Sequence, residues 1–132
     1  MPLVFMHRRP DTNTRVPVVR ADNLAAAHDA VGHVIDLGHR DLSMIAAPRA
    51  LPTASERLRG SRGACEKAGL DVREECVREG FRGIEGGYQA TRKVLALDSR
   101  PAAVFSFNNL LTVGDPCTPC ARAACRFALT CC

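Results

Sequence analysis

Residues 16–57, VPVVRADNLAAAHDAVGHVIDLGHRDLSMIAAPRALPTASER, decide the fold of this chain. An apolar strand is expected at 16–20, and Asp22 or Asn23 can serve as the N-cap of the helix that follows. That helix carries apolar residues at helical spacing, ends at Gly38 and is followed by a second apolar strand. Strand, helix and strand in this order form one βαβ unit, and in such units the ligand crevice lies at the carboxyl ends of the strands.

The same alternation continues to residue 107. Thr53 and Glu56 have the spacing of a capping box, which predicts that a second helix starts there. The alternation predicts an α/β fold: a parallel sheet with helices on both faces, joined by right-handed crossovers. The expected strands are 3–6, 16–20, 42–47, 75–78 and 102–107, and the later helices are expected at 53–68 and 84–97.

The composition fits one globular domain. The chain has 132 residues, of which 46% are hydrophobic, and this is enough for a single core. Aromatic residues make up 5%, and the net charge of +4 is scattered along the chain, so a nucleic-acid stacking platform is poorly supported. No segment approaches the ~20 apolar residues of a membrane span, and the N-terminus puts its apolar residues before its positive ones, the reverse of a secretory signal. We therefore expect a cytoplasmic protein with no membrane partner.

The sequence does not support an enzyme. It has no nucleophile elbow, phosphate loop or paired dinucleotide glycines. His28 and His33 are five residues apart, so they do not share one helix face as residues at i and i+4 would. We expect no catalytic residues and no cofactor.

Polar side chains follow the expected strands. Arginine forks, carboxylates and amides together supply the directional donors and acceptors that recognise a sugar or a nucleobase-like molecule. A structural role stays open for each of them, because the Asp, Asn and Thr side chains can cap helices and Arg57 can be a solvated helix residue. The side chains in question are Asp22, Asn23, Arg49, Thr53, Arg57, Arg82, Glu85, Asn108 and Asn109.

Three segments carry a resemblance to a known family. They are VPVVRADNLAAAHDAVGHVIDLGHRDLSMIAA at 16–47, ERLRGSRGACEKAG at 56–69 and GGYQATRKVLALDSRPAAVFSFNN at 86–109. In this order they resemble the effector-binding domain of the lactose-repressor (LacI/GalR) family of bacterial transcription regulators. The likeness covers about residues 2–114.

This resemblance implies a periplasmic-binding-protein-like fold, in which two α/β lobes close around a small effector. Residues 16–114 would form the C-terminal lobe, and residues 1–15 would be a remnant of the first lobe and its crossover. Arg57 matches an arginine that grips effector hydroxyls, and Asn109 stands where the family usually has the Asp of an Asn-Asp pair. Carried over residue by residue, the implied ligand contacts are Asn23, Thr53, Arg57 and Asn109.

The resemblance also implies the partners. We expect a small-molecule effector, namely a sugar, and the homodimer typical of the family. The family's helix-turn-helix has no counterpart in this sequence, so we expect DNA binding only through an N-terminal domain that the sequence lacks. The alternative is a free-standing small-ligand binding module of the same fold.

Residues 115–132 depart from the pattern. Five of the seven cysteines lie there, and Pro116 and Pro119 disfavour a smooth helix. A shifted reading frame in a gene rich in G and C would produce such a change, so we interpret 115–132 as a non-native or disordered tail. The alternative is a metal- or redox-binding protein that uses Cys117, Cys120 and Cys125, because CxxC lets two thiolates reach one tetrahedral ion.

Overall fold

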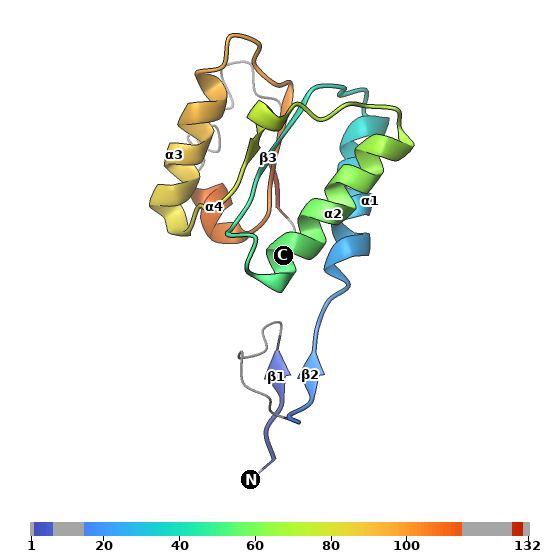
Figure 1. Cartoon of the computed structure of the whole chain (residues 1–132), viewed down its shortest axis with the longest axis vertical. Helices are drawn as coiled ribbons and strands as arrows, with labels where there is room; N and C mark the ends of the chain where they lie inside the picture. Colours follow the sequence, from blue (N-terminus) through green and yellow to red (C-terminus); the bar gives the residue numbers. More distant parts are fainter. Residues whose placement is uncertain (1, 7–14, 115–127, 131–132) are drawn as a thin grey trace.

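The computed structural model describes residues 2–6, 15–114 and 128–130 of the chain. Its main sheet has four parallel strands in the order β4-β3-β5-β6 (Figure 1). The predicted α/β fold with a parallel sheet is therefore confirmed. The βαβ unit predicted to start with a strand at 16–20 was wrong, because the strand at Val18–Val19 pairs with Phe5–Met6 and does not join this sheet. The four strands are β3 (Leu42–Ile45), β4 (Val77–Arg78), β5 (Ala103–Ser106) and β6 (Ala128–Thr130).

Helices cover both faces of this sheet. The pair α1 and α2 lies on one side and the pair α3 and α4 on the other (Figure 1). The central strands β3 and β5 are buried along their whole length, as expected where a parallel sheet is covered on both faces. The helices are α1 (Asn23–Asp36), α2 (Pro52–Lys67), α3 (Gly83–Leu95) and α4 (Asn109–Val113), and the 3-10 helix η1 (Glu74–Cys76) precedes β4.

The core is divided by the sheet into two clusters. Met44 and Phe105 are register partners that face α1 and α2 and pack in a cluster with Val31 and Leu58. Their neighbours in the strands point the other way, because side chains alternate across a strand. Ile45 and Val104 thus pack with Ala90, Val94 and Leu111 from α3 and α4.

Both predicted ends of α1 are confirmed. The Asp22 carboxylate accepts a hydrogen bond of 3.0 Å from the Ala25 amide and caps the start of α1. Gly38 takes the left-handed conformation, with φ of 94°, just beyond the end of α1.

The predicted capping box at Thr53 and Glu56 was wrong. Helix α2 begins at Pro52, whose fixed φ suits a first helical position, so Thr53 already lies inside the first turn.

The predicted strand at 75–78 was only half right. Its first two residues belong to η1, where the Cys76 amide donates to the Arg73 carbonyl at 2.8 Å. The Ser43 hydroxyl of β3 donates to the Cys76 carbonyl at 2.6 Å. Strand pairing with β3 therefore starts at Val77, which lies opposite Met44.

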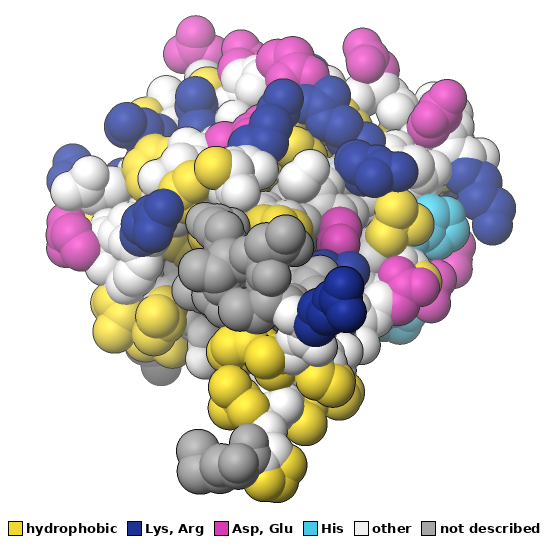
Figure 2. Space-filling model, turned by 60° about the horizontal axis from the view of Figure 1, so that its bottom comes forward, with side chains coloured by type: hydrophobic (Ala, Val, Ile, Leu, Met, Phe, Trp, Pro, Cys, Tyr) yellow, Lys and Arg dark blue, Asp and Glu magenta, His cyan; other side chains and the backbone are white. Residues whose placement is uncertain are grey.

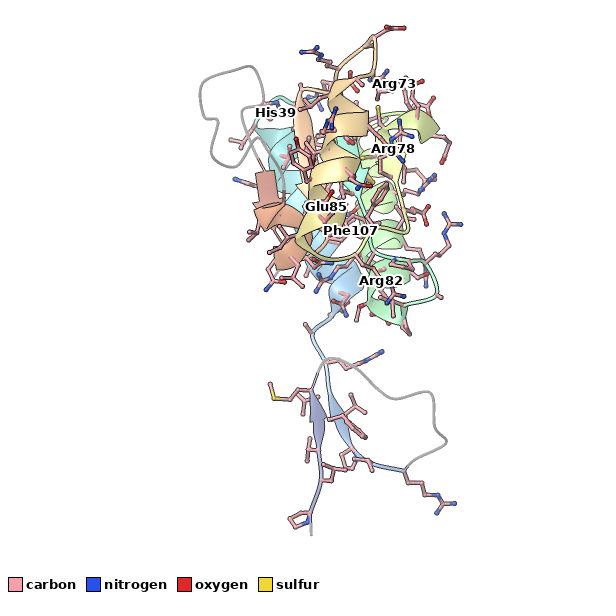
Figure 3. All side chains as sticks on the ribbon, turned by 90° about the vertical axis from the view of Figure 1, so that its left-hand side faces the viewer. His39, Arg73, Arg78, Arg82, Glu85 and Phe107 are labelled. Atoms are coloured by element: carbon pink, nitrogen blue, oxygen red, sulfur yellow. The ribbon has the colours of Figure 1, made fainter. Side chains whose placement is uncertain are left out.

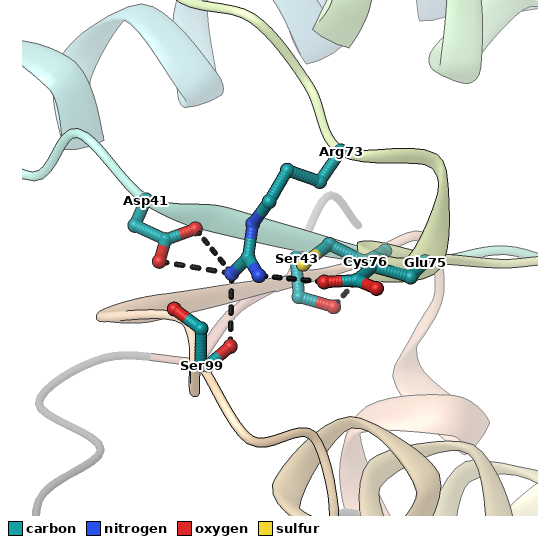
Figure 4. Close-up of polar contacts among 6 residues, drawn as sticks. All are labelled: Asp41, Ser43, Arg73, Glu75, Cys76 and Ser99. Atoms are coloured by element: carbon teal, nitrogen blue, oxygen red, sulfur yellow. Dashed lines mark hydrogen bonds and ion pairs between the residues drawn. The ribbon is translucent and has the colours of Figure 1, made fainter.

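An arginine ties together the segments at the amino ends of the strands. The Arg73 guanidinium donates to both carboxylate oxygens of Asp41 at 3.0 Å, to the Ser99 carbonyl at 2.9 Å and to Glu75 at 2.7 Å (Figure 4). The hydrogen bond to Asp41 is the main cause that raises the pKa of Arg73. This group thus joins the loop after α3 to the start of β3.

A second, two-stranded parallel sheet stands apart from the body. It consists of β1 (Phe5–Met6) and β2 (Val18–Val19) and projects below the four-stranded sheet (Figure 1). Hydrophobic side chains gather on this projection (Figure 2), and Met6 is 71% and Val19 63% exposed. Within the described ranges, no helix is long and apolar enough to cross a bilayer.

Candidate functional site

The parallel order of the strands brings their carboxyl ends to one edge of the sheet. Arg82, Glu85 and Phe107 lie toward this end of the body, while His39 and Arg73 lie toward the opposite end (Figure 3). The first turn of α1 reaches the same edge, because Arg57 is hydrogen-bonded both to Asn23, the first residue of α1, and to the Phe107 carbonyl just beyond β5. This is the edge at which the sequence predicted a ligand site.

Asn23 is held at this edge with little freedom. It is the first residue of α1 and only 4% exposed. Its amide nitrogen donates to a Glu56 carboxylate oxygen at 3.0 Å and to the Ala21 carbonyl at 3.3 Å. Its amide oxygen accepts from the Arg57 Nε at 2.9 Å. The structure therefore brings together two of the predicted ligand contacts.

Arg57 links α2 to the end of β5. While Nε is bound to Asn23, Nη1 donates to the backbone carbonyl of Phe107, just beyond β5. The arginine is partly buried. A planar guanidinium carries its N–H donors in a fixed fork, which suits recognition of hydroxyl or carbonyl oxygens.

Glu56 and Arg20 complete the group, and the sequence did not predict this role for either. The Glu56 carboxylate accepts from Asn23 and forms an ion pair with Arg20 at 3.4 Å. Glu56 was predicted to take part in a helix cap, so its real partners, more than thirty residues away in the chain, were hidden by a local motif. Its position directly before Arg57 in the sequence indicated that it lies near the predicted site, but not which residues its side chain contacts.

Thr53 and Asn109 lie at the same edge. The structure places both residues there, and their contact with a ligand stays a prediction. Thr53 is one turn ahead of Arg57 on α2 and is partly exposed. Asn109 is exposed at the first position of α4, and its side-chain oxygen accepts from the Leu110 amide at 2.9 Å. Its neighbour Asn108 caps α4 by accepting from the Leu111 amide, so the structural interpretation holds for Asn108.

Arg49, another of the predicted polar residues at this edge, forms an ion pair with Glu79. Arg49 donates from Nε to Glu79 at 2.8 Å, which joins the loop after β3 to the loop after β4. The hydrogen bond to Glu79 is the main cause that raises the pKa of the exposed Arg49 guanidinium. We therefore assign Arg49 a structural role at the rim.

The alternative metal site falls on Cys117, Cys120 and Cys125, which lie outside the described residues. In the part of the chain that the structure describes, no cluster of three or more His, Cys, Asp or Glu side chains could hold a metal ion. Cys65 and Cys76 are buried thiols in this part, and burial raises the pKa of both.

Comparison with known proteins identifies the family of this chain. Residues 1–117 match the model of the family described as periplasmic binding proteins and sugar binding domain of LacI family. The chain is 35% identical over 114 residues to the HTH-type transcriptional repressor PurR of Pasteurella multocida and 31% identical to CytR of Escherichia coli K12. Each alignment covers 86% of this chain, which spans about a third of the length of these curated relatives (34% and 33%).

Solved structures give the same result. A regulatory protein of LacI family from Chloroflexus aggregans superposes with a TM-score of 0.75 at 28% identity, over 92% of this chain and 43% of that one. The transcriptional regulator CelR in complex with cellobiose also has a TM-score of 0.75, at 27% identity, over 96% of this chain and 40% of that one. The curated relatives are transcriptional repressors rather than enzymes, as the sequence led us to expect for this chain. The chain belongs to the family of periplasmic binding proteins and LacI-type sugar-binding domains.

Proposed function

We propose that this chain is the effector-sensing lobe of a LacI-type transcriptional repressor and that its effector is a sugar. The observation that carries the proposal is the hydrogen-bonded pair of Asn23 and Arg57 at the carboxyl edge of the sheet. Thr53 and Asn109, which lie at the same edge, are proposed as further contacts. An amide at position 109 both donates and accepts, so it suits hydroxyl groups without adding a negative charge.

The experiment is a calorimetric titration of the chain with cellobiose, the ligand of the similar CelR structure, and with the nucleobases adenine and guanine. Heat with cellobiose supports the sugar assignment, and heat with a nucleobase alone refutes it. Arg57→Ala should abolish the heat. Arg59→Ala is the matched control, because Arg59 is an exposed arginine on the same helix, and it should bind as the unaltered chain does.

We further propose that β1 and β2 belong to the first lobe of such a protein, so that the second lobe would begin after Val19 rather than at residue 16. Two isolated parallel strands are marginal by themselves, and each exposes one of its two side chains, Met6 in β1 and Val19 in β2. A complementary lobe would cover them and close the effector site from the other side. Operator binding is then proposed for a helix-turn-helix domain and not for the α/β lobe, and a cytoplasmic location follows from this role.

A second copy of the chain is proposed as the partner of α3 and α4. Ile84 and Tyr88 on α3 are exposed, as are Leu110 and Val113 on α4. The end of α4 packs closely against α3, because a Cβ on Gly114 would lie 1.8 Å from the Ile84 carbonyl oxygen, and we propose that the exposed side chains of the two helices act together in this contact. Light scattering after size exclusion should give a dimer for the unaltered chain and a monomer for Leu110→Glu.

The boundary at residue 114 stays a prediction. Strand β6 lies beyond it and pairs with β5 in parallel. Resequencing the coding DNA across codon 114 in all frames tests whether a shifted frame continues the family pattern.

A further inference from the structure

We propose that Glu56 is a positioning residue that orients Arg57 for the effector, acting through the amide of Asn23. The effect on effector binding rests on the proposed function, whereas the hydrogen bonds from Glu56 to Asn23 and from Asn23 to Arg57 do not. The chain of contacts runs from the Glu56 carboxylate to the Asn23 amide nitrogen at 3.0 Å, and from the Asn23 amide oxygen to Arg57 Nε at 2.9 Å.

The Asn23 amide has two orientations, and only one of them serves Arg57. Its nitrogen is a donor only and its oxygen an acceptor only, so a flipped amide would direct N–H groups at the Arg57 Nε–H. Glu56 and the Ala21 carbonyl are both acceptors and lie on the nitrogen side. They therefore select the orientation in which the oxygen faces the arginine.

Burial makes this selection strong. Asn23 is 4% exposed, so water competes little for its amide, and an unsatisfied donor there would be costly. The Glu56 side chain is itself held by the ion pair with Arg20 at 3.4 Å. Arg20 belongs to the segment between β2 and α1, so the orientation of Arg57 also depends on that segment.

A binding side chain fixed in its productive geometry loses less entropy when the ligand arrives. Loss of the Glu56 acceptor leaves Arg57 in place but frees the amide that holds its Nε. The protection of the Arg57 Nε–H against exchange with solvent should therefore fall, with or without a ligand.

The experiment measures the exchange rate of the Arg57 Nε–H by NMR on the ¹⁵N-labelled full chain, with the signal assigned from its loss in Arg57→Lys. Glu56→Ala should raise the rate about tenfold, the equivalent of one hydrogen bond to a charged group. Glu56→Gln should stay near the unaltered rate, because its side-chain carbonyl still accepts from Asn23. The matched control is Glu66→Ala, an exposed glutamate on the same helix.

An unchanged rate in Glu56→Ala overturns the proposal, and so does an equal rise in Glu56→Ala and Glu56→Gln, since that would indicate a charge effect. If Glu56→Ala does not fold by circular dichroism, Arg20→Ala replaces it and should raise the rate as well, while no rise overturns the proposal. Calorimetric titration of the same variants with cellobiose tests the proposed function separately from the exchange measurement. No heat with the unaltered chain would refute sugar sensing and leave the exchange result standing.

Discussion

Gly60→Ala should destabilise the lobe by separating α1 from α2 next to the candidate site. The two helices cross where Gly60 faces the backbone of α1. A Cβ added at Gly60 would lie 2.1 Å from the Leu24 carbonyl oxygen and 3.1 Å from the His28 amide nitrogen. Both neighbours are backbone atoms within a helix, so the clash is relieved only if one helix moves as a body.

The expected cost is that of overpacking a core, about 2–3 kcal/mol. For a domain of this size such a loss lowers the midpoint of thermal unfolding by roughly 10 °C. Gly63→Ala is the matched control on the same helix, because its Cβ would lie 3.9 Å from the His28 ring, an ordinary contact. Alanine is the better helix former, so this control should gain about 0.5–1 kcal/mol.

Urea and thermal unfolding of both variants, followed by circular dichroism, measure the difference. The reasoning requires the two alanines to act with opposite sign. If Gly60→Ala proves as stable as Gly63→Ala, the close approach of α1 and α2 is refuted, and with it the packing that brings Asn23 to Arg57.

Four further outcomes are expected. Arg57→Lys should weaken effector binding by about tenfold in a calorimetric titration, because an ammonium group cannot hold two acceptors and a ligand in one plane; unchanged affinity would remove Arg57 from the site. Arg73→Ala should lower the midpoint of thermal unfolding, because the guanidinium joins three segments. The decrease should be larger at low salt, where ion pairs are screened less. An identical melting curve would show that the Arg73 contacts contribute nothing to stability. Cys65 and Cys76 should resist alkylation until the chain unfolds, as peptide mass mapping can establish. Burial raises the pKa of both thiols in the folded state, so unfolded thiols ionise first and stability should fall as the pH rises above about 8.5, which a pH series of urea midpoints would test.

Local sequence signals were sufficient for most elements. The Asp22 cap, the left-handed Gly38 and the apolar run before Asn108 each depend on interactions within a few residues, and each was predicted correctly. The Thr53 and Glu56 pair failed because two local signals competed there. A proline at the first helical position started α2 earlier than the capping motif indicated.

The sequence by itself determined the alternation of strands and helices, and hence the parallel sheet and the edge at which a ligand site can form. Periodicity and cap residues are local, so they can be read along the chain. Only the tertiary structure decided that Glu56, Asn23 and Arg57 form one hydrogen-bonded group, and that the Phe107 carbonyl anchors it. These contacts join residues up to fifty positions apart, and the direction of a side chain across such a distance depends on how the helices pack.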